Sequence, residues 1–170
     1  MRHHLRTVII GNSGSGKTWL STQLGDRFDV PVVHLDEIFW LAGGFDAKRE
    51  PAEVAEIISR ERAAAKWVVE GVYGDLASEF LPAAQTLIWL DLPWLVCKLR
   101  LEARGSESKS HMNHAQTEEG LKALIAWAEG YSSRKGSSGR TSHASLFELF
   151  AGERHRFESE DQVLAFVNAA

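Results

Sequence analysis

The stretch that decides the fold is Gly11-Asn12-Ser13-Gly14-Ser15-Gly16-Lys17-Thr18, which matches the pattern G-x-x-x-x-G-K-[ST] at every fixed position. Residues 7–10, just before it, form a short run rich in β-branched side chains, which predicts a strand. Residues 17–25 predict a helix. A glycine-rich loop between a strand and a helix is the context that this pattern requires, so the match is specific.

The residue types of this loop suit the phosphates of a nucleotide. Glycine permits backbone angles and close approaches that a Cβ atom forbids, so successive N–H groups can turn toward phosphate oxygens. We expect Lys17 to bridge the β- and γ-phosphates of ATP and the Thr18 hydroxyl to bind Mg²⁺. The alternative, a glycine-rich turn with a solvated lysine, gives no reason for Lys and Thr to stand together. All residues from Gly11 to Thr18 are therefore candidate ATP-binding residues.

Composition limits the remaining classes of protein. The chain has 170 residues, 44% hydrophobic and 25% charged, which is typical of one globular domain spanning 1–170. Its net charge of −4 argues against direct nucleic-acid binding. Cys97 is the single cysteine and lies in an apolar run, which favours a buried thiol in the reducing cytoplasm. The apolar residues 8–10 are too few for a signal peptide or membrane span, so we expect a cytoplasmic protein.

Predicted strands and helices alternate along the rest of the chain. The predicted strands are residues 30–35, 67–69 and 86–90, with 154–157 a candidate edge strand. The predicted helices are residues 51–66, 93–104, 118–132, 144–150 and 161–167. This alternation indicates an α/β fold with a parallel sheet between two helical layers and a ligand crevice outside the carboxyl ends of the strands.

Three carboxylates follow predicted strands and so fall near that crevice. They are Asp36, Glu70 and Asp91. We expect Glu70 to hold Mg²⁺ through water; the alternative is an ordinary acid at a strand end that caps a helix. Asp91 stands two residues before Pro93, and we interpret it as the N-cap of the next helix.

In four stretches the chain resembles the adenylate kinase and shikimate kinase branch of P-loop proteins, and most closely the small DNA topology modulation (FlaR-type) proteins. They are residues 10–18, His34-Leu35-Asp36-Glu37-Ile38-Phe39-Trp40, Glu70-Gly71-Val72-Tyr73-Gly74 and Ile88-Trp89-Leu90-Asp91-Leu92-Pro93. The likeness covers nearly the whole chain. It implies a three-layer P-loop NTPase domain with a five-stranded parallel sheet, a small mobile lid at about 105–117, and ATP as phosphate donor.

The same resemblance implies roles for basic residues around the lid. Arg100 is expected to lie against the adenine and Arg104 to reach the phosphates; the alternative is a solvated helix face that also carries Lys98. Where the lid returns, Arg134 is expected to reach the phosphates. Residues 72–75 lack the arginine with which adenylate kinases grip the acceptor phosphate, and this departure argues against a nucleoside monophosphate acceptor.

Asp36 follows the second predicted strand and is expected to orient or deprotonate the hydroxyl of an acceptor. Glu37 is its rival for this role. The alternatives for Asp36 are binding of Mg²⁺ through water and, as a structural role, capping of the turn into residues 38–40. The sequence thus predicts a small-molecule kinase that uses ATP and Mg²⁺ on an unidentified acceptor, with Lys17, Asp36, Arg104 and Arg134 catalytic. The alternatives are an ATP-dependent regulatory protein linked to DNA topology and a slow NTPase switch.

Overall fold

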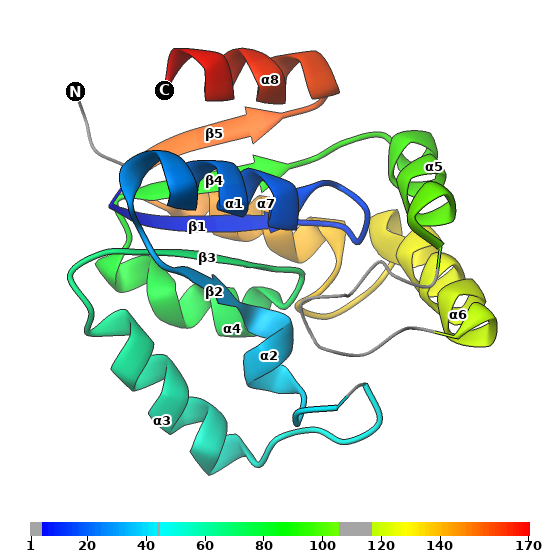
Figure 1. Ribbon diagram of the computed structural model, residues 1–170, viewed down its shortest axis with the longest axis horizontal. Coiled ribbons are helices and arrows are strands. Elements are labelled where there is room, and N and C mark those ends of the chain that lie inside the picture. The colour runs from blue at the N-terminus through cyan, green and yellow to red at the C-terminus, as the bar shows by residue number, and fades with distance from the viewer. Residues whose placement is uncertain (1–4, 44, 106–116) are drawn as a thin grey trace.

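The computed structural model describes residues 5–43, 45–105 and 117–170, which form strands and helices around one sheet (Figure 1). In chain order the elements are β1 (Arg6–Gly11), α1 (Lys17–Phe28), β2 (Val32–His34), α2 (Leu35–Phe39), α3 (Pro51–Arg62), β3 (Trp67–Gly71), α4 (Gly74–Phe80), η1 (Leu81–Ala83), β4 (Thr86–Leu90), α5 (Trp94–Arg104), α6 (Glu118–Glu129), η4 (Gly130–Ser132), α7 (Arg140–Leu149), β5 (Glu153–Phe157) and α8 (Glu160–Ala169).

The strands form one parallel sheet in the order β2-β3-β1-β4-β5. The central strand is β1, so the glycine-rich loop leaves the middle of the sheet's carboxyl edge. Ile9 of β1 lies level with Glu70 of β3, which brings that carboxylate next to the loop. The predicted α/β fold and five-stranded parallel sheet are confirmed.

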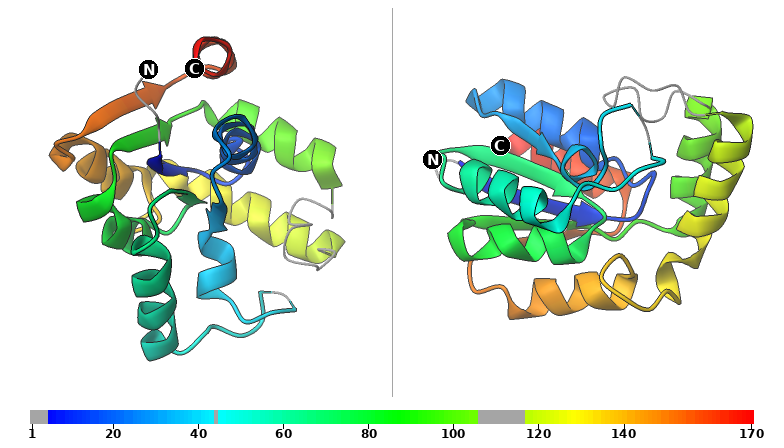
Figure 2. Two further views of the ribbon diagram at one scale, coloured as in Figure 1. Left: turned by 60° about the vertical axis from the view of Figure 1, so that its left-hand side comes forward. Right: turned by 90° about the horizontal axis from the view of Figure 1, so that it is seen from below.

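Helices cover both faces of the sheet and give it three layers (Figures 1 and 2). Successive side chains of a strand point to opposite faces. Val8 and Ile10 therefore pack in the core beneath α2, α3, α4 and α7, whereas Ile9 packs in the core beneath α1 and α8. All three side chains are 0% exposed. Burial on both faces explains why β1 is continuously apolar instead of alternating.

Two further helices, α5 and α6, lie side by side beyond the carboxyl ends of the strands (Figures 1 and 2). They bracket the segment predicted to be a lid, of which residues 106–116 lie outside the described residues. Among the described residues, no helix is long and apolar enough to cross a membrane.

The structure adds two helices that the sequence does not predict. They are α2, of five residues, and α4, of seven. Each is too short for helical periodicity to show in its sequence. The helix predicted at 144–150 begins earlier, at Arg140, and its first turn includes the buried His143.

Candidate active site

Two glycines of the phosphate loop are required by their backbone and by their neighbours. Gly14 and Gly16 have φ angles of 78° and 94°, a conformation that favours glycine. A Cβ atom at Gly14 would stand 2.5 Å from the carbonyl oxygen of Cys97, and one at Gly16 would stand 2.7 Å from Nη1 of Arg100. Helix α5 thus packs directly against the loop.

The loop presents polar groups that suit a bound triphosphate. Lys17 is buried, and its Nζ donates to the carbonyl oxygen of Asn12 at 2.8 Å. The hydroxyl of Ser15 is buried and has no hydrogen-bond partner among the described residues. The cap residue of α1 is Gly16, which has no side chain to occupy the first N–H groups of the helix. A buried cation, an unpartnered hydroxyl and an open helix N terminus fit a phosphate ligand.

The side chain of Asn12 ties this loop to helix α6. Its Oδ1 accepts a hydrogen bond from the backbone N–H of Ser13 at 2.8 Å. Its Nδ2 donates to the carbonyl oxygen of Ala128, near the end of α6, at 2.9 Å. The loop is therefore held from two sides, by α5 and by α6.

The two residues predicted to bind Mg²⁺ are in contact. Thr18 Oγ1 donates to Glu70 Oε1 at 3.3 Å, and His34 Nδ1 lies 2.7 Å from the same oxygen. Burial by itself lowers the pKa of His34, but the hydrogen bond and negative charge of Glu70 outweigh it and raise the pKa above its usual value.

Among the described residues, no group of three or more His, Cys, Asp and Glu side chains is placed to hold a metal. A magnesium ion at Thr18 and Glu70 would therefore take further ligands from phosphate oxygens and water, which is how Mg²⁺ binds in many phosphoryl-transfer sites. His34 was not a candidate in the sequence. The signal that could have found His34 is its place as a polar residue at the end of an otherwise apolar strand.

A cavity of about 270 Å³ lies on the α5 side of the loop. Its lining consists of loop residues, two arginines of α5, one acid of α8 and apolar residues of α1 and α8: Ser15, Gly16, Trp19, Arg100, Arg104, Glu160, Val163 and Leu164. Arg100 donates from Nη1 to the carbonyl oxygen of Ser15 at 2.8 Å, and its Nη2 lies 2.6 Å from Glu160 Oε1. Arg100 thus joins the loop to the start of α8.

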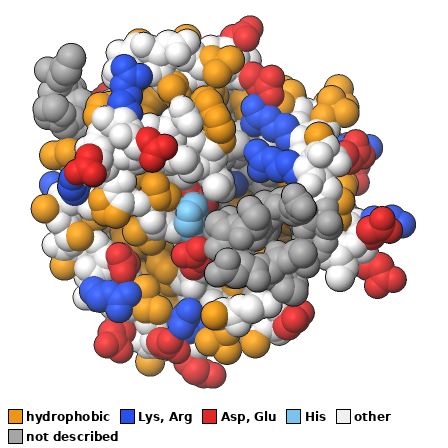
Figure 3. All heavy atoms as spheres, in the orientation of Figure 1, with side chains coloured by type: hydrophobic (Ala, Val, Ile, Leu, Met, Phe, Trp, Pro, Cys, Tyr) orange, Lys and Arg blue, Asp and Glu red, His pale blue; other side chains and the backbone are white. Residues whose placement is uncertain are grey.

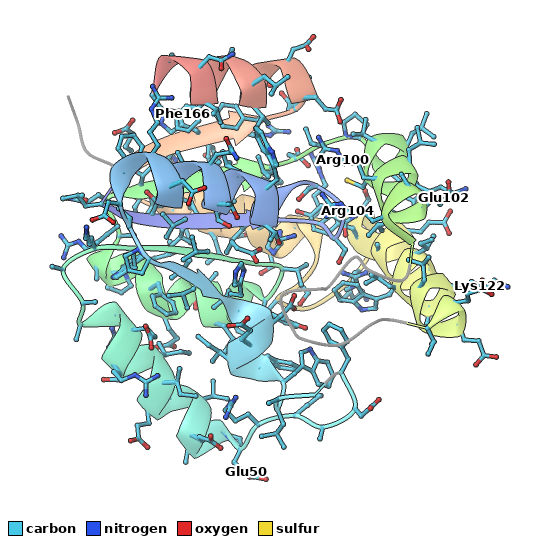
Figure 4. The ribbon with its side chains drawn as sticks, in the orientation of Figure 1. Glu50, Arg100, Glu102, Arg104, Lys122 and Phe166 are labelled. Atoms are coloured by element: carbon cyan, nitrogen blue, oxygen red, sulfur yellow. The ribbon has the colours of Figure 1, made fainter. Side chains whose placement is uncertain are left out.

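Arg100 and Arg104 point from α5 toward the phosphate loop, whereas Glu102 on the same helix points away (Figure 4). Basic side chains also gather beside a hollow in this face of the molecule (Figure 3). Burial, and then the charge of Arg100, lower the pKa of Arg104. Two guanidinium groups so close together favour an anionic ligand.

Trp19 and Leu164 line this smaller cavity and were not predicted as site residues. Their side chains are 41% and 48% exposed, high values for residues of this size and polarity. Exposed apolar side chains around a cavity offer a flat ring a place to bind. The signal that could have found Trp19 is its place directly after Lys17 and Thr18.

A larger cavity of about 690 Å³ lies on the other side of the loop, among α2, the end of β3 and α6. Its volume is in the range of small-molecule sites. Its charged lining residues are Lys17, Asp36, Asp46, Lys48 and Glu70. Its aromatic lining residues are Phe39, Trp40, Phe45, Tyr73 and Trp127. Phe39, Trp40 and Tyr73 lie in the stretches that carry the family resemblance, whereas Phe45 and Trp127 lie outside them.

Asp36 is buried and lies on α2 in the wall of the larger cavity. The Tyr73 hydroxyl accepts from Trp40 Nε1 at 2.8 Å and is hydrogen-bonded to Asp36. Burial, followed by the charge of Asp36, raises the pKa of Tyr73, so the phenol stays protonated and donates to the carboxylate. The cap residue of α2 is His34, so Asp36 does not occupy the cap position.

The interpretation of Asp91 as a helix N-cap is wrong. The cap residue of α5 is Pro93. Asp91 instead accepts hydrogen bonds from Arg140 at 2.8 and 2.7 Å and from Arg156 at 3.1 and 2.6 Å. Although burial raises its pKa, the hydrogen bonds and charges of the two arginines outweigh this and lower it. Hydrogen bonds to two charged guanidinium groups attract the carboxylate more strongly than the backbone N–H groups at the start of a helix would.

Arg134 contacts residues close to it in the sequence. It donates to the carbonyl oxygens of Ser138, at 3.0 Å, and of Trp127. Its guanidinium also lies over the Trp127 ring, 3.6 Å from the centroid. A role at the phosphates stays a prediction, and it requires these contacts to break.

Comparison with known proteins shows the fold. No model of a known protein family matches the chain, and no curated protein matches its sequence. A gluconokinase from Sinorhizobium meliloti 1021 has 17% identity over 99% of this chain and 90% of that chain, with a TM-score of 0.55. A shikimate kinase from Aquifex aeolicus has 16% identity over 97% and 92%, with a TM-score of 0.52.

A third similar structure is the YorR protein from Bacillus subtilis, solved in complex with phosphorylated GDP. It has 12% identity over 96% of this chain and 94% of that chain, with a TM-score of 0.53. These likenesses establish a P-loop kinase fold. The closer resemblance to FlaR-type proteins stays a prediction.

Proposed function

We propose that this protein is a kinase that transfers the γ-phosphate of ATP, with Mg²⁺, to a hydroxyl group of a small molecule. One observation carries the proposal. Neighbouring residues of a single phosphate loop line two different cavities: Ser15 and Gly16 line the smaller, and Ser13 and Lys17 line the larger. A phosphoryl group held on the loop would face both a donor site and an acceptor site.

The smaller cavity suits the nucleotide. Its apolar side chains, Trp19 and Leu164, would contact the base, while Arg100 would lie beside it, already fixed to Ser15 and Glu160. The backbone N–H groups of the loop and Lys17 would hold the phosphates. Magnesium would be bound directly by the Thr18 hydroxyl and through a water molecule by Glu70, and it would neutralise phosphate charge.

The larger cavity suits the acceptor. Asp36, which the Tyr73 phenol holds in position, would accept a hydrogen bond from the acceptor hydroxyl. As the acceptor oxygen bonds to the γ-phosphorus, the bond from phosphorus to the bridging oxygen breaks and ADP leaves. The acceptor's proton passes to Asp36. Arg104 would meet the charge on the transferring group, and such preorganised charge lowers the barrier.

The test is a screen for ADP release that depends on an acceptor. Purified protein with Mg·ATP is given, one class at a time, nucleosides, nucleoside monophosphates, sugars and small hydroxy acids, and products are identified by mass. Acceptor-dependent ADP release with a phosphorylated product supports the proposal. Steady ADP release without any acceptor, or ATP binding with no release, contradicts it and favours an NTPase switch or a regulatory ATP-binding protein.

A further inference from the structure

The wall of the larger cavity is a connected group of aromatic rings. Phe39 stacks on Tyr73 with ring centroids 4.4 Å apart, and it meets Trp40 edge to face at 4.9 Å. Trp40 in turn meets Phe45 edge to face at 5.8 Å. Rings that hold one another in this way form a rigid apolar surface, which loses little conformational entropy when a ligand binds.

Helix α6 contributes another ring, Trp127, to the same cavity. One face of this ring is covered by the guanidinium of Arg134, which also binds the Trp127 carbonyl oxygen. The side chain is nevertheless 39% exposed and lines the cavity with surface that the guanidinium does not cover. The indole is therefore fixed in place with surface left for a flat ligand.

The charges around this cavity do not suit an anionic acceptor. Asp36 is buried, whereas Asp46 and Lys48 are exposed and the Nζ of Lys48 lies over the Phe39 ring, 5.4 Å from its centroid. Lys17 belongs to the phosphate loop. The described lining includes no arginine, the residue best suited to grip a phosphate or carboxylate with two parallel hydrogen bonds. Arg49, next to Lys48, is bound to Glu53 and to backbone carbonyl oxygens of α2.

From this lining we infer that the acceptor is an uncharged, hydroxyl-bearing molecule with a flat aromatic part, the chemical class of the nucleosides. The inference rests on the kinase function proposed above and names its acceptor class. The aromatic part packs against Trp127 and the connected rings, and the hydroxyl faces Asp36. An acceptor that carries a phosphate or a carboxylate of its own would be repelled by the buried negative charge of Asp36, and the described lining has no arginine to bind that group.

The experiment measures binding separately from catalysis. Nucleosides, their 5′-monophosphates, free sugars and sugar acids are titrated by calorimetry into protein saturated with magnesium and a non-hydrolysable ATP analogue, which blocks the nucleotide cavity. Each nucleoside and its monophosphate differ only in the phosphate. We expect at least one nucleoside to bind tenfold or more tightly than its monophosphate and than the sugars.

The variant Trp127→Leu is expected to weaken that binding about tenfold, the range for loss of one aromatic stacking partner. Trp94→Leu, on α5 and outside both cavities, is the matched control and should bind as the parent does. Tighter binding of a monophosphate, a sugar acid or a free sugar overturns the inference and leaves the proposed function standing. Nucleoside binding without phosphoryl transfer to any acceptor supports the binding preference and refutes the proposed function.

Discussion

His143 gives the sharpest quantitative prediction, because it is a titratable group in a closed hydrogen-bond chain. Its side chain is 0% exposed. Nε2 donates to the Val72 carbonyl oxygen at 2.8 Å, and Nδ1 lies 2.7 Å from the Tyr131 hydroxyl. That hydroxyl accepts from Trp89 Nε1 at 3.0 Å, so it donates to Nδ1. The neutral imidazole satisfies this chain and holds the backbone at Val72, a residue that lines the larger cavity.

Burial first, and then the charges of Lys17 and Arg134, lower the pKa of His143 from 6.5 to about 4. Above pH 6.5 the histidine is neutral in both states and its contribution is fully present. As the pH falls toward 4, the unfolded chain binds a proton that the folded protein does not, so stability is lost. Between pH 7.5 and pH 5 this amounts to about 2 kcal/mol of the free energy of unfolding.

The assay is urea unfolding of the parent and His143→Gln at pH 7.5 and pH 5. Glutamine is uncharged and can still donate to Val72, so the variant should be less stable at pH 7.5 but lose about 2 kcal/mol less than the parent on acidification. His155→Gln, on the edge strand β5, controls for loss of a histidine elsewhere. An equal loss in the parent and His143→Gln would refute the reasoning.

Three further substitutions test the site. Arg104→Ala should lower turnover about a hundred- to a thousandfold, or about 3 to 4 kcal/mol, with a smaller effect on ATP affinity; steady-state kinetics within a factor of two of the Lys98→Ala control would make Arg104 a surface residue. Asp36→Asn should lower the rate but leave ATP affinity and melting temperature unchanged, and full activity would exclude a catalytic role. Gly14→Ala should cost about 1 to 3 kcal/mol in urea unfolding, because its Cβ would stand 2.5 Å from the Cys97 oxygen; parent-like stability would show that α5 yields.

The parts of the site that follow strands were accessible to sequence reasoning. The phosphate loop has a fixed spacing, and Glu70 ends an apolar run, so the parallel sheet brings both to one edge. Asp36 follows the next strand in the same way and lines the larger cavity. The local sequence pattern is enough to locate such residues, because the end of a strand and the geometry of the following loop depend mainly on neighbouring residues in the chain.

The parts that depend on contacts between distant segments were not accessible. Asp91 precedes a helix, which suggested a cap, but its partners Arg140 and Arg156 are far along the chain. Trp127 lies on a helix whose sequence gives no sign of the cavity it enters.

The most direct test of the account is the thermal stabilisation of the protein by Mg·ATP, compared with that of Lys17→Met. Ligand at a hundred times its Kd stabilises the parent by about 2.7 kcal/mol, which raises Tm by about 5 to 10 °C for a chain of this size. The variant should keep the parent's secondary structure by circular dichroism and show no such rise, because the buried cation of the loop is gone. An equal rise in Lys17→Met would contradict the assignment of the phosphate loop, on which both proposed sites depend.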